Sequence, residues 1–152
     1  DAKLRLELRK EIKAIQREFN ITTIFVTHDQ EEAFSIADKI MLMNKGELIQ
    51  FSRPRELYEN PTTKFSLDFI GSVNYDEKNS RFSRLEDVYF DDKGEEMEVL
   101  DYSFKGQIIE YTLLTSDGTT IRTVSLNRKG EFAVGEKVNA IVNWSPLDKL
   151  DK

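Results

Sequence analysis

The chain has 152 residues, enough for one ordinary domain or two small ones, with 39% hydrophobic and 33% charged side chains. It contains no run approaching the ~18 apolar residues that span a bilayer. The lack of cysteine excludes a disulfide scaffold and a thiolate metal site, and a single histidine excludes a multi-histidine metal site within one chain. Of the net charge of −6, residues 71–152 carry −5, which argues against a nucleic-acid partner.

The first segment has the apolar period of an amphipathic helix that ends at Asn20. We interpret its apolar stripe as ordinary core packing. Residues 21–26, ITTIFV, form a short β-branched run that predicts a strand buried on both faces of a parallel sheet. Helix followed at once by strand is typical of an α/β fold. The stripe consists of Leu4, Leu8, Ile12, Ile15 and Phe19.

A second helix is predicted to begin just after the lone histidine, His28. Asp29 is a favourable N-cap residue, and Glu32 stands three positions later, as in a capping box. The acidic residues Glu31 and Glu32 also suit the positive end of the helix dipole. We therefore interpret these three carboxylates as helix-capping groups and not as catalytic ones.

The rest of the first half alternates strands and short helices. Residues 39–43 and 47–51 predict a strand pair around an Asn-Lys-Gly turn. A helix is expected to start at Pro54, and another covers roughly residues 63–70 and ends at Gly71.

The second half is rich in strands. The boundary is predicted in the polar stretch 71–80, and Asp117-Gly118 is the clearest hairpin signal. Five short antiparallel strands predict a small OB-type barrel. The fold class expected is an α/β fragment followed by an all-β, OB-like domain. The predicted strands are residues 81–90, 95–104, 107–115, 119–126 and 136–144.

His28 follows the predicted strand, and ligands bind outside the carboxyl ends of parallel strands. Its imidazole could donate a hydrogen bond to a phosphate oxygen or to an attacking water. The segment from Thr23 to Pro61, with T-H-D-x-x-E-A, A-D-K-I, x-x-G and a Pro-containing helix ending in N-P, resembles the end of an ABC ATPase domain. This resemblance implies that His28 is the switch histidine of the H-loop, in contact with the γ-phosphate of the nucleotide. The opening D-A-K-L-R resembles the segment that begins at the last residue of the D-loop, which implies that Asp1 is the D-loop aspartate at the ATPase dimer interface.

Three tail segments resemble the small OB-like regulatory domain, called TOBE, that follows the ATPase domain in the importers for maltose-type sugars, polyamines, ferric ion, sulfate and phosphonates. By this resemblance, residues 1–71 are the C-terminal part of the ATPase domain and residues 72–152 are the TOBE domain. Glu110-Tyr111 leans toward polyamine or ferric-ion systems, but the transported solute is not predicted. The three segments are RLEDVYF, EVLDYSFKGQIIEYTLLTSDG and GEKVNAIVNW.

The resemblance implies an energy-coupling subunit that hydrolyses ATP with Mg²⁺ to drive solute uptake. It implies a homodimer with a second ATPase subunit, direct contact with transmembrane permease subunits and an indirect one with an extracytoplasmic solute-binding protein. The location implied is the cytoplasmic face of the plasma membrane. Since the sequence lacks a G-x-x-x-x-G-K-[ST] phosphate loop, we expect this fragment to be inactive alone, with no tightly bound cofactor. It is also expected to dimerise or domain-swap, because exposed strand edges pair with another copy.

Two other interpretations stay open. The chain could be a standalone regulatory module whose β domain binds a small ligand or a protein partner, and not an ATPase. Its aromatic residues could also form a base-stacking surface of an OB fold, although the acidic surroundings favour core packing. The acidic cluster Asp91, Asp92, Glu95 and Glu96 is interpreted as a solvated hairpin tip, because it lacks the Ca²⁺-loop spacing. The aromatic residues are Tyr102, Phe104, Tyr111 and Trp144.

Overall fold

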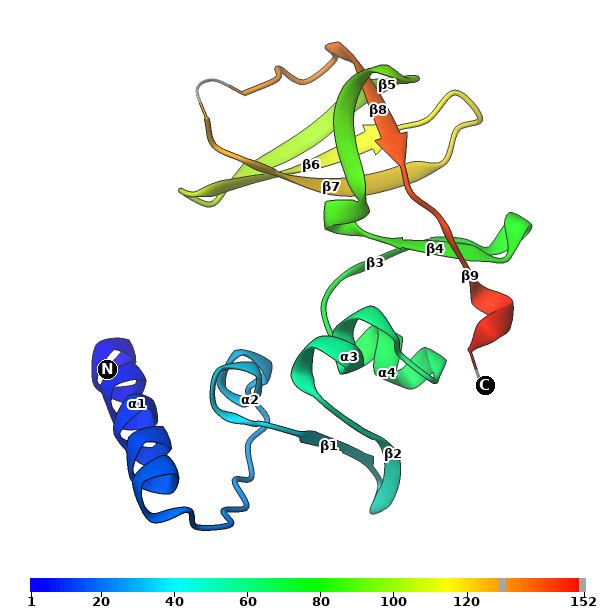
Figure 1. Ribbon diagram of the computed structural model, residues 1–152. Helices are drawn as coiled ribbons and strands as arrows, with labels where there is room; N and C mark the ends of the chain where they lie inside the picture. Colours follow the sequence, from blue (N-terminus) through cyan, green and yellow to red (C-terminus); the bar gives the residue numbers. More distant parts are fainter. Residues whose placement is uncertain (129–130, 151–152) are drawn as a thin grey trace. The chain divides into compact units, whose positions relative to one another are not determined.

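The computed structural model describes residues 1–128 and 131–150, so the last two residues of the predicted domain 72–152 lie outside the described residues, as do residues 129–130. The chain divides into two units, Asp1–Ile70 with the residue Leu150, and Gly71–Lys149 (Figure 1). Within the described ranges, no helix combines the length and the apolar character needed to cross a membrane.

The first unit begins with helix α1, Ala2–Phe19 (Figure 1). The carboxylate of Asp1 caps it by accepting the backbone N–H of Lys3 at 2.9 Å. Asn20 ends it in the left-handed conformation, with φ of 49°. The predicted helix and its end are confirmed.

The expectation that the apolar stripe of α1 is core packing is wrong for this structure. No residue of α1 is buried, and Leu4 and Phe19 keep 64% and 63% of their surface exposed. Helix α2, Gln30–Ile36, packs against α1. The side chains of α1 that form hydrogen bonds to α2 are cationic: Arg9 donates to Glu32, and Lys13 donates to the carbonyl of Ser35. The apolar side chains of α1 therefore have no apolar surface among the described residues that would bury them.

The strand predicted for residues 21–26 is also wrong. The segment is irregular, and Ile24 and Val26 are 89% and 91% exposed. A strand needs a neighbour to pair its backbone N–H and C=O groups. No strand of the described chain lies beside this segment, so the β-branched sequence alone does not produce a strand here.

A two-stranded antiparallel sheet follows α2, formed by β1, Ile40–Asn44, and β2, Glu47–Ser52. The two turn residues Lys45 and Gly46 both have positive φ, 49° and 84°, as a type I′ turn requires. The predicted strand pair and its turn are confirmed.

Two short helices complete the first unit, α3 (Pro54–Glu59) and α4 (Lys64–Phe69), both as predicted. Gly71 follows the second with φ of 78°, a left-handed conformation that glycine adopts without strain. The small core of the unit holds Leu42, Leu57 and Ile70, with Phe34, Ile40, Ile49, Tyr58 and Phe65 packed around it.

The second unit contains a three-stranded sheet in the order β3-β4-β9, with strands Val73–Asp76, Arg81–Arg84 and Ser145–Pro146. The stretch 71–80, predicted to be a polar boundary, therefore contributes a paired strand. Buried Asn74 accepts the backbone N–H of Arg122 and donates to its carbonyl, both at 2.8 Å, which explains why this polar segment is ordered. Single-turn 3₁₀ helices at Glu77–Asn79, Leu85–Asp87 and Leu147–Lys149 flank these strands.

A four-stranded antiparallel sheet forms the larger part of this unit, in the order β7-β6-β5-β8. Its strands are β5 (Val88–Phe104), β6 (Ile108–Leu114), β7 (Thr120–Leu126) and β8 (Lys137–Val142). Burial alternates along β6, so one face of the sheet covers the core. The core consists of Val88, Met97, Val99, Ile109, Tyr111, Leu113, Ile121, Val138 and Ala140.

The prediction of residues 81–90 as one strand is wrong, because the 3₁₀ helix Leu85–Asp87 separates β4 from β5, which lie in different sheets. The loop expected between 90 and 95 is also wrong, because β5 runs through it and bends strongly (Figure 1). Residues 91–94 form a bulge, so that Ala140 lies opposite both Phe90 and Glu95. A Cβ on Gly94 would lie 2.3 Å from the backbone of Ala140, so only glycine fits there. The predicted fold class, an α/β fragment followed by an all-β OB-like part, is confirmed.

Candidate functional site

His28 lies at a bend directly before α2, and its side chain is exposed. Among the described residues, none forms a hydrogen bond or an ion pair with the imidazole. The ring nitrogens are therefore available to a partner that approaches from solvent.

The turn that carries His28 is held by its two neighbours. Asp29 Oδ1 accepts the N–H of Glu32 at 3.1 Å, which confirms Asp29 as the N-cap of α2. The second half of the predicted capping box differs, because the N–H of Asp29 donates to Thr27 Oγ1 at 3.0 Å. The hydroxyl of Thr27 in turn donates to the carboxylate of Glu32. Thr27 and Asp29 thus fix the backbone on both sides of His28.

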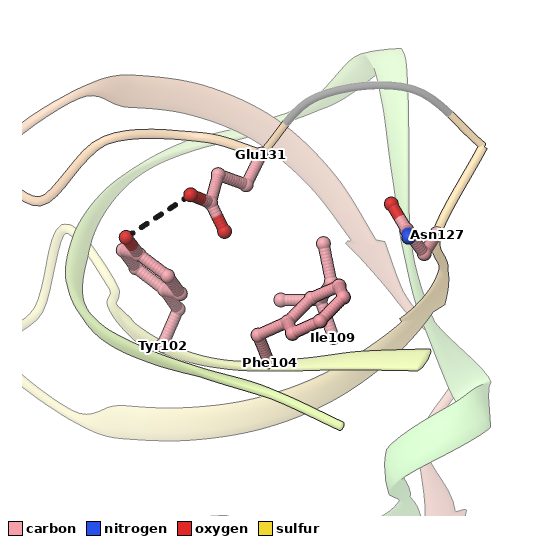
Figure 2. Close-up of a pocket in the computed structure, with 5 residues that line it drawn as sticks. All are labelled: Tyr102, Phe104, Ile109, Asn127 and Glu131. Atoms are coloured by element: carbon pink, nitrogen blue, oxygen red, sulfur yellow. Dashed lines mark hydrogen bonds between the residues drawn. The ribbon is translucent and has the colours of Figure 1, made fainter. Parts of the chain in front are cut away.

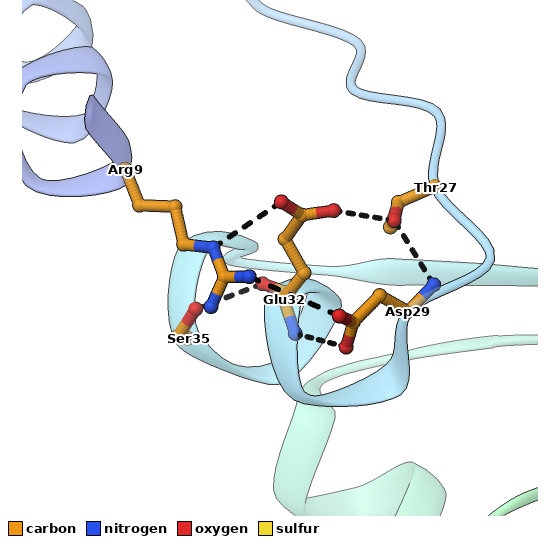
Figure 3. Close-up of polar contacts among 5 residues, drawn as sticks. All are labelled: Arg9, Thr27, Asp29, Glu32 and Ser35. Atoms are coloured by element: carbon orange, nitrogen blue, oxygen red, sulfur yellow. Dashed lines mark hydrogen bonds and ion pairs between the residues drawn. The ribbon is translucent and has the colours of Figure 1, made fainter. Parts of the chain in front are cut away.

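Arg9 on α1 joins this network from a distant part of the sequence, as Figure 3 shows. Its Nε donates to Glu32 Oε1 at 3.2 Å, and its Nη2 lies 3.9 Å from Asp29 Oδ2. The periodicity of α1 marks only its apolar face, so sequence reasoning missed this residue. Arginine residues are common on the polar faces of helices, so the presence of Arg9 on α1 did not by itself indicate this contact.

Asp1, the second predicted site residue, is exposed, and its carboxylate caps α1. The described residues show no hydrogen bond or ion pair that links Asp1 to His28. The roles implied for both residues, at the γ-phosphate and at a dimer interface, stay predictions. Within residues 1–128 and 131–150, no three or more acidic, histidine or cysteine side chains gather as a metal-binding group.

A shallow pocket of about 440 Å³ in the second unit is a separate candidate site (Figure 2). It is lined by Tyr102, Phe104, Ile109, Asn127 and Glu131. The hydroxyl of Tyr102 donates to Glu131 Oε1 at 3.2 Å, and this hydrogen bond to a carboxylate raises the pKa of Tyr102.

The four aromatic residues considered for base stacking do not share one surface. Tyr102 and Phe104 line the pocket, whereas Tyr111 is buried and its hydroxyl accepts the N–H of Phe132 at 3.1 Å. Trp144 is covered by the guanidinium of Arg81, 4.5 Å from the ring centroid. The arrangement favours the core-packing interpretation for the last two.

The Glu110-Tyr111 pair is explained by contacts inside the β domain. Glu110 lies between Lys105 Nζ at 2.6 Å and Arg122 Nη1 at 3.2 Å. These cations, first through the hydrogen bond from Lys105, lower the pKa of Glu110. Tyr111 belongs to the core, so contacts inside the β domain account for both residues, and the lean toward polyamine or ferric-ion systems stays a prediction.

No family model matches the chain. Its relatives are import ATP-binding proteins. The Bacillus cereus sulfate/thiosulfate import ATP-binding protein CysA is 53% identical over 74 residues, which cover 49% of this chain and 21% of the relative. The Borreliella afzelii spermidine/putrescine import ATP-binding protein PotA is 42% identical over 107 residues, 70% of this chain and 30% of the relative. The Fe(3+) ions import ATP-binding protein FbpC 1 of Pectobacterium atrosepticum is 46% identical over 74 residues, 49% of this chain and 21% of the relative.

The chain thus spans about a fifth to three tenths of the length of the relatives it matches. It resembles the C-terminal part of the ATP-binding subunit of an ABC importer. The names of these relatives cover three unlike solutes at comparable identity, so similarity alone does not choose one for this chain.

Proposed function

We propose that this chain is the C-terminal part of the energy-coupling ATP-binding subunit of an ABC importer, which hydrolyses ATP to drive solute uptake. The observation that carries this proposal is the 42% identity to an import ATP-binding protein over 70% of the chain. On this proposal, residues 1–71 end the ATPase domain and residues 72–152 form the TOBE regulatory domain.

In the ATPase, His28 serves as the switch histidine. Its exposed imidazole, on a turn held by hydrogen bonds on both sides, suits a group that donates to a γ-phosphate oxygen and senses the attacking water. Asp1 contributes the D-loop carboxylate at the interface with the second ATPase subunit. Neither role requires a side-chain partner inside this chain.

The phosphates of ATP and the Mg²⁺ ion are held by residues outside this chain. The printed sequence has no glycine-rich phosphate loop with its lysine, and such loops neutralise and position the transferred phosphoryl group. We expect this fragment alone to bind ATP weakly and not to hydrolyse it.

The exposed apolar side chains of the first unit support a larger domain in the intact protein. Leu4, Phe19, Ile24 and Val26 are all more than half exposed, and a soluble domain seldom leaves so many large apolar groups in water. We propose that a further part of the ATPase domain covers them, and that the fragment alone pairs with a second copy. The remaining partners are the permease subunits and, through them, the solute-binding protein, at the cytoplasmic face of the plasma membrane.

Replacement of His28 by Ala in the full-length subunit tests the assignment. We expect His28→Ala to lower ATP turnover about 100-fold, the typical cost of losing one transition-state donor, and to leave ATP affinity near that of the parent. Steady-state turnover and equilibrium nucleotide binding are the measurements. Glu47→Ala serves as a control, because Glu47 is exposed and its side chain forms no polar contact with the described residues. Parental turnover in His28→Ala would rule out the switch role.

A second candidate function is a standalone regulatory or ligand-binding β module that is not an ATPase. The pocket beside Tyr102 and Phe104 favours it. The two candidates differ in the gene, because only the ATPase requires a phosphate-loop sequence upstream of Asp1. Reading the upstream coding sequence decides between them.

A further inference from the structure

The side chain of Arg9 is mostly withdrawn from solvent. It is 14% exposed, although it lies on a helix with no buried residue. The carboxylate it contacts, Glu32, is 20% exposed. A partly buried pair is less screened by salt and water than a surface pair, so its geometry is held more firmly.

The contacts of Arg9 lead to both neighbours of His28. One path runs from Arg9 Nε to Glu32 Oε1 at 3.2 Å, and from the other oxygen of Glu32 to the hydroxyl of Thr27. The second path runs from Arg9 Nη2 to Asp29 Oδ2 at 3.9 Å. Figure 3 shows the guanidinium between α1 and the start of α2, with the carboxylates of Glu32 and Asp29 turned toward it.

We propose that Arg9 is a positioning residue for His28: its guanidinium holds the Thr27-His28-Asp29 turn in place through Glu32 and Asp29. The proposal rests on the proposed switch role of His28. Two separate nitrogens of the guanidinium, Nε and Nη2, face the two carboxylates, whereas lysine has a single nitrogen and holds two acceptors with less fixed geometry. The remaining cation of α1 near α2, Lys13, donates to the carbonyl of Ser35 at 3.4 Å and does not reach the turn.

Arg9→Gln in the full-length subunit tests the proposal. We expect kcat for ATP to fall about 10-fold, while the ATP dissociation constant and the thermal midpoint stay close to those of the parent, because a misplaced donor is lost mainly in the transition state. Arg9→Lys is expected to restore part of kcat. Arg5→Gln, one turn earlier on α1, is the matched control, because its side chain is exposed and has no polar contact with the described residues. We expect parental kcat for this variant.

The combination with His28→Ala separates positioning from general stability. If Arg9 acts through His28, then Arg9→Gln adds no further loss of kcat in the His28→Ala background. Two losses that multiply would overturn the proposal. A parental kcat in Arg9→Gln, together with a lowered kcat in His28→Ala, would also overturn the proposal. In that case the switch role of His28 still stands.

A second measurement does not depend on turnover. Amide hydrogen exchange at Asp29 and Glu32, whose N–H groups bond to Thr27 and Asp29, should become about 10-fold faster in Arg9→Gln and unchanged in Arg5→Gln. Unchanged exchange in Arg9→Gln would contradict the proposal. If Arg9→Gln lowers the thermal midpoint, Glu32→Gln replaces it, since glutamine can still accept the Thr27 hydroxyl but no longer attracts the guanidinium. Parental turnover in His28→Ala together with faster exchange in Arg9→Gln would reject the switch role, and with it a catalytic purpose for Arg9.

Discussion

Glu110 on β6 shows how a residue acquires its environment from three segments of the β domain. Lys105 and Arg122 approach it from the preceding turn and from β7, and they lower its pKa from the ordinary value of 4.5. A carboxylate whose pKa is lower in the folded state stabilises the fold above its unfolded pKa, and the stabilisation is lost as the pH falls through the folded pKa.

We therefore expect Glu110→Gln to lower the urea midpoint at pH 7 and to have a much smaller effect at pH 3. The fluorescence of Trp144, the single tryptophan, reports unfolding of the unit that contains Glu110. Glu96→Gln is the control, because Glu96 is exposed and its side chain has no polar contact with the described residues. An equal loss at both pH values would show that the ion pairs contribute nothing.

At the scale of elements, α4 depends on its first residues. Helices of this length are not stable alone, so α4 needs its caps and the burial of Leu67. Thr63 Oγ1 accepts the N–H of Ser66 at 3.0 Å, and Ser66 Oγ accepts the N–H of Thr63 at 3.1 Å.

Thr63→Ala removes one of these two reciprocal bonds, and we expect it to cost about 1 kcal/mol of local stability. Hydrogen exchange of the Leu67 amide, which bonds to the carbonyl of Thr63 at 3.1 Å, measures the effect. Thr22→Ala, at an exposed position with no polar side-chain contact to the described residues, should leave this exchange rate unchanged. Equal exchange in both variants would mean that burial alone holds α4.

At the scale of the whole molecule, the two units differ in how much apolar surface they bury. The second has a continuous core across its larger sheet, whereas the first has a small cluster around Leu42, Leu57 and Ile70 and leaves most of α1 in solvent. Burial of apolar surface is the main favourable contribution to folding, so the units should differ in stability.

We expect residues 71–150, expressed alone, to unfold in one sharp thermal transition. Residues 1–70 alone should bind the apolar dye ANS and self-associate, because their apolar side chains remain exposed. Circular dichroism, dye fluorescence and light scattering are the measurements. A monomeric 1–70 fragment with a sharp transition and no dye binding would contradict this account.

The features that the sequence by itself determined are local. Asn20 ends α1, Asp29 caps α2, Pro54 starts α3, and Asp117-Gly118 joins β6 to β7, because each depends on the backbone preferences of a few neighbouring residues. The H-loop resemblance of the segment around His28 was also accessible from the sequence, since it depends on one contiguous segment. The exposure of His28 was not predicted, because the buried strand expected before it does not form.

Only the tertiary structure decided the features that depend on a distant partner. Residues 21–26 have the composition of a strand but lack a neighbour to pair with, and the polar segment of Asn74 becomes a strand because Arg122 satisfies its amide. The loop expected between residues 90 and 95 becomes a bulge because β8 pairs with β5 on both sides of it. Arg9 meets Glu32 across 23 positions of sequence, and a pairing over such a distance leaves no periodic signal in the chain.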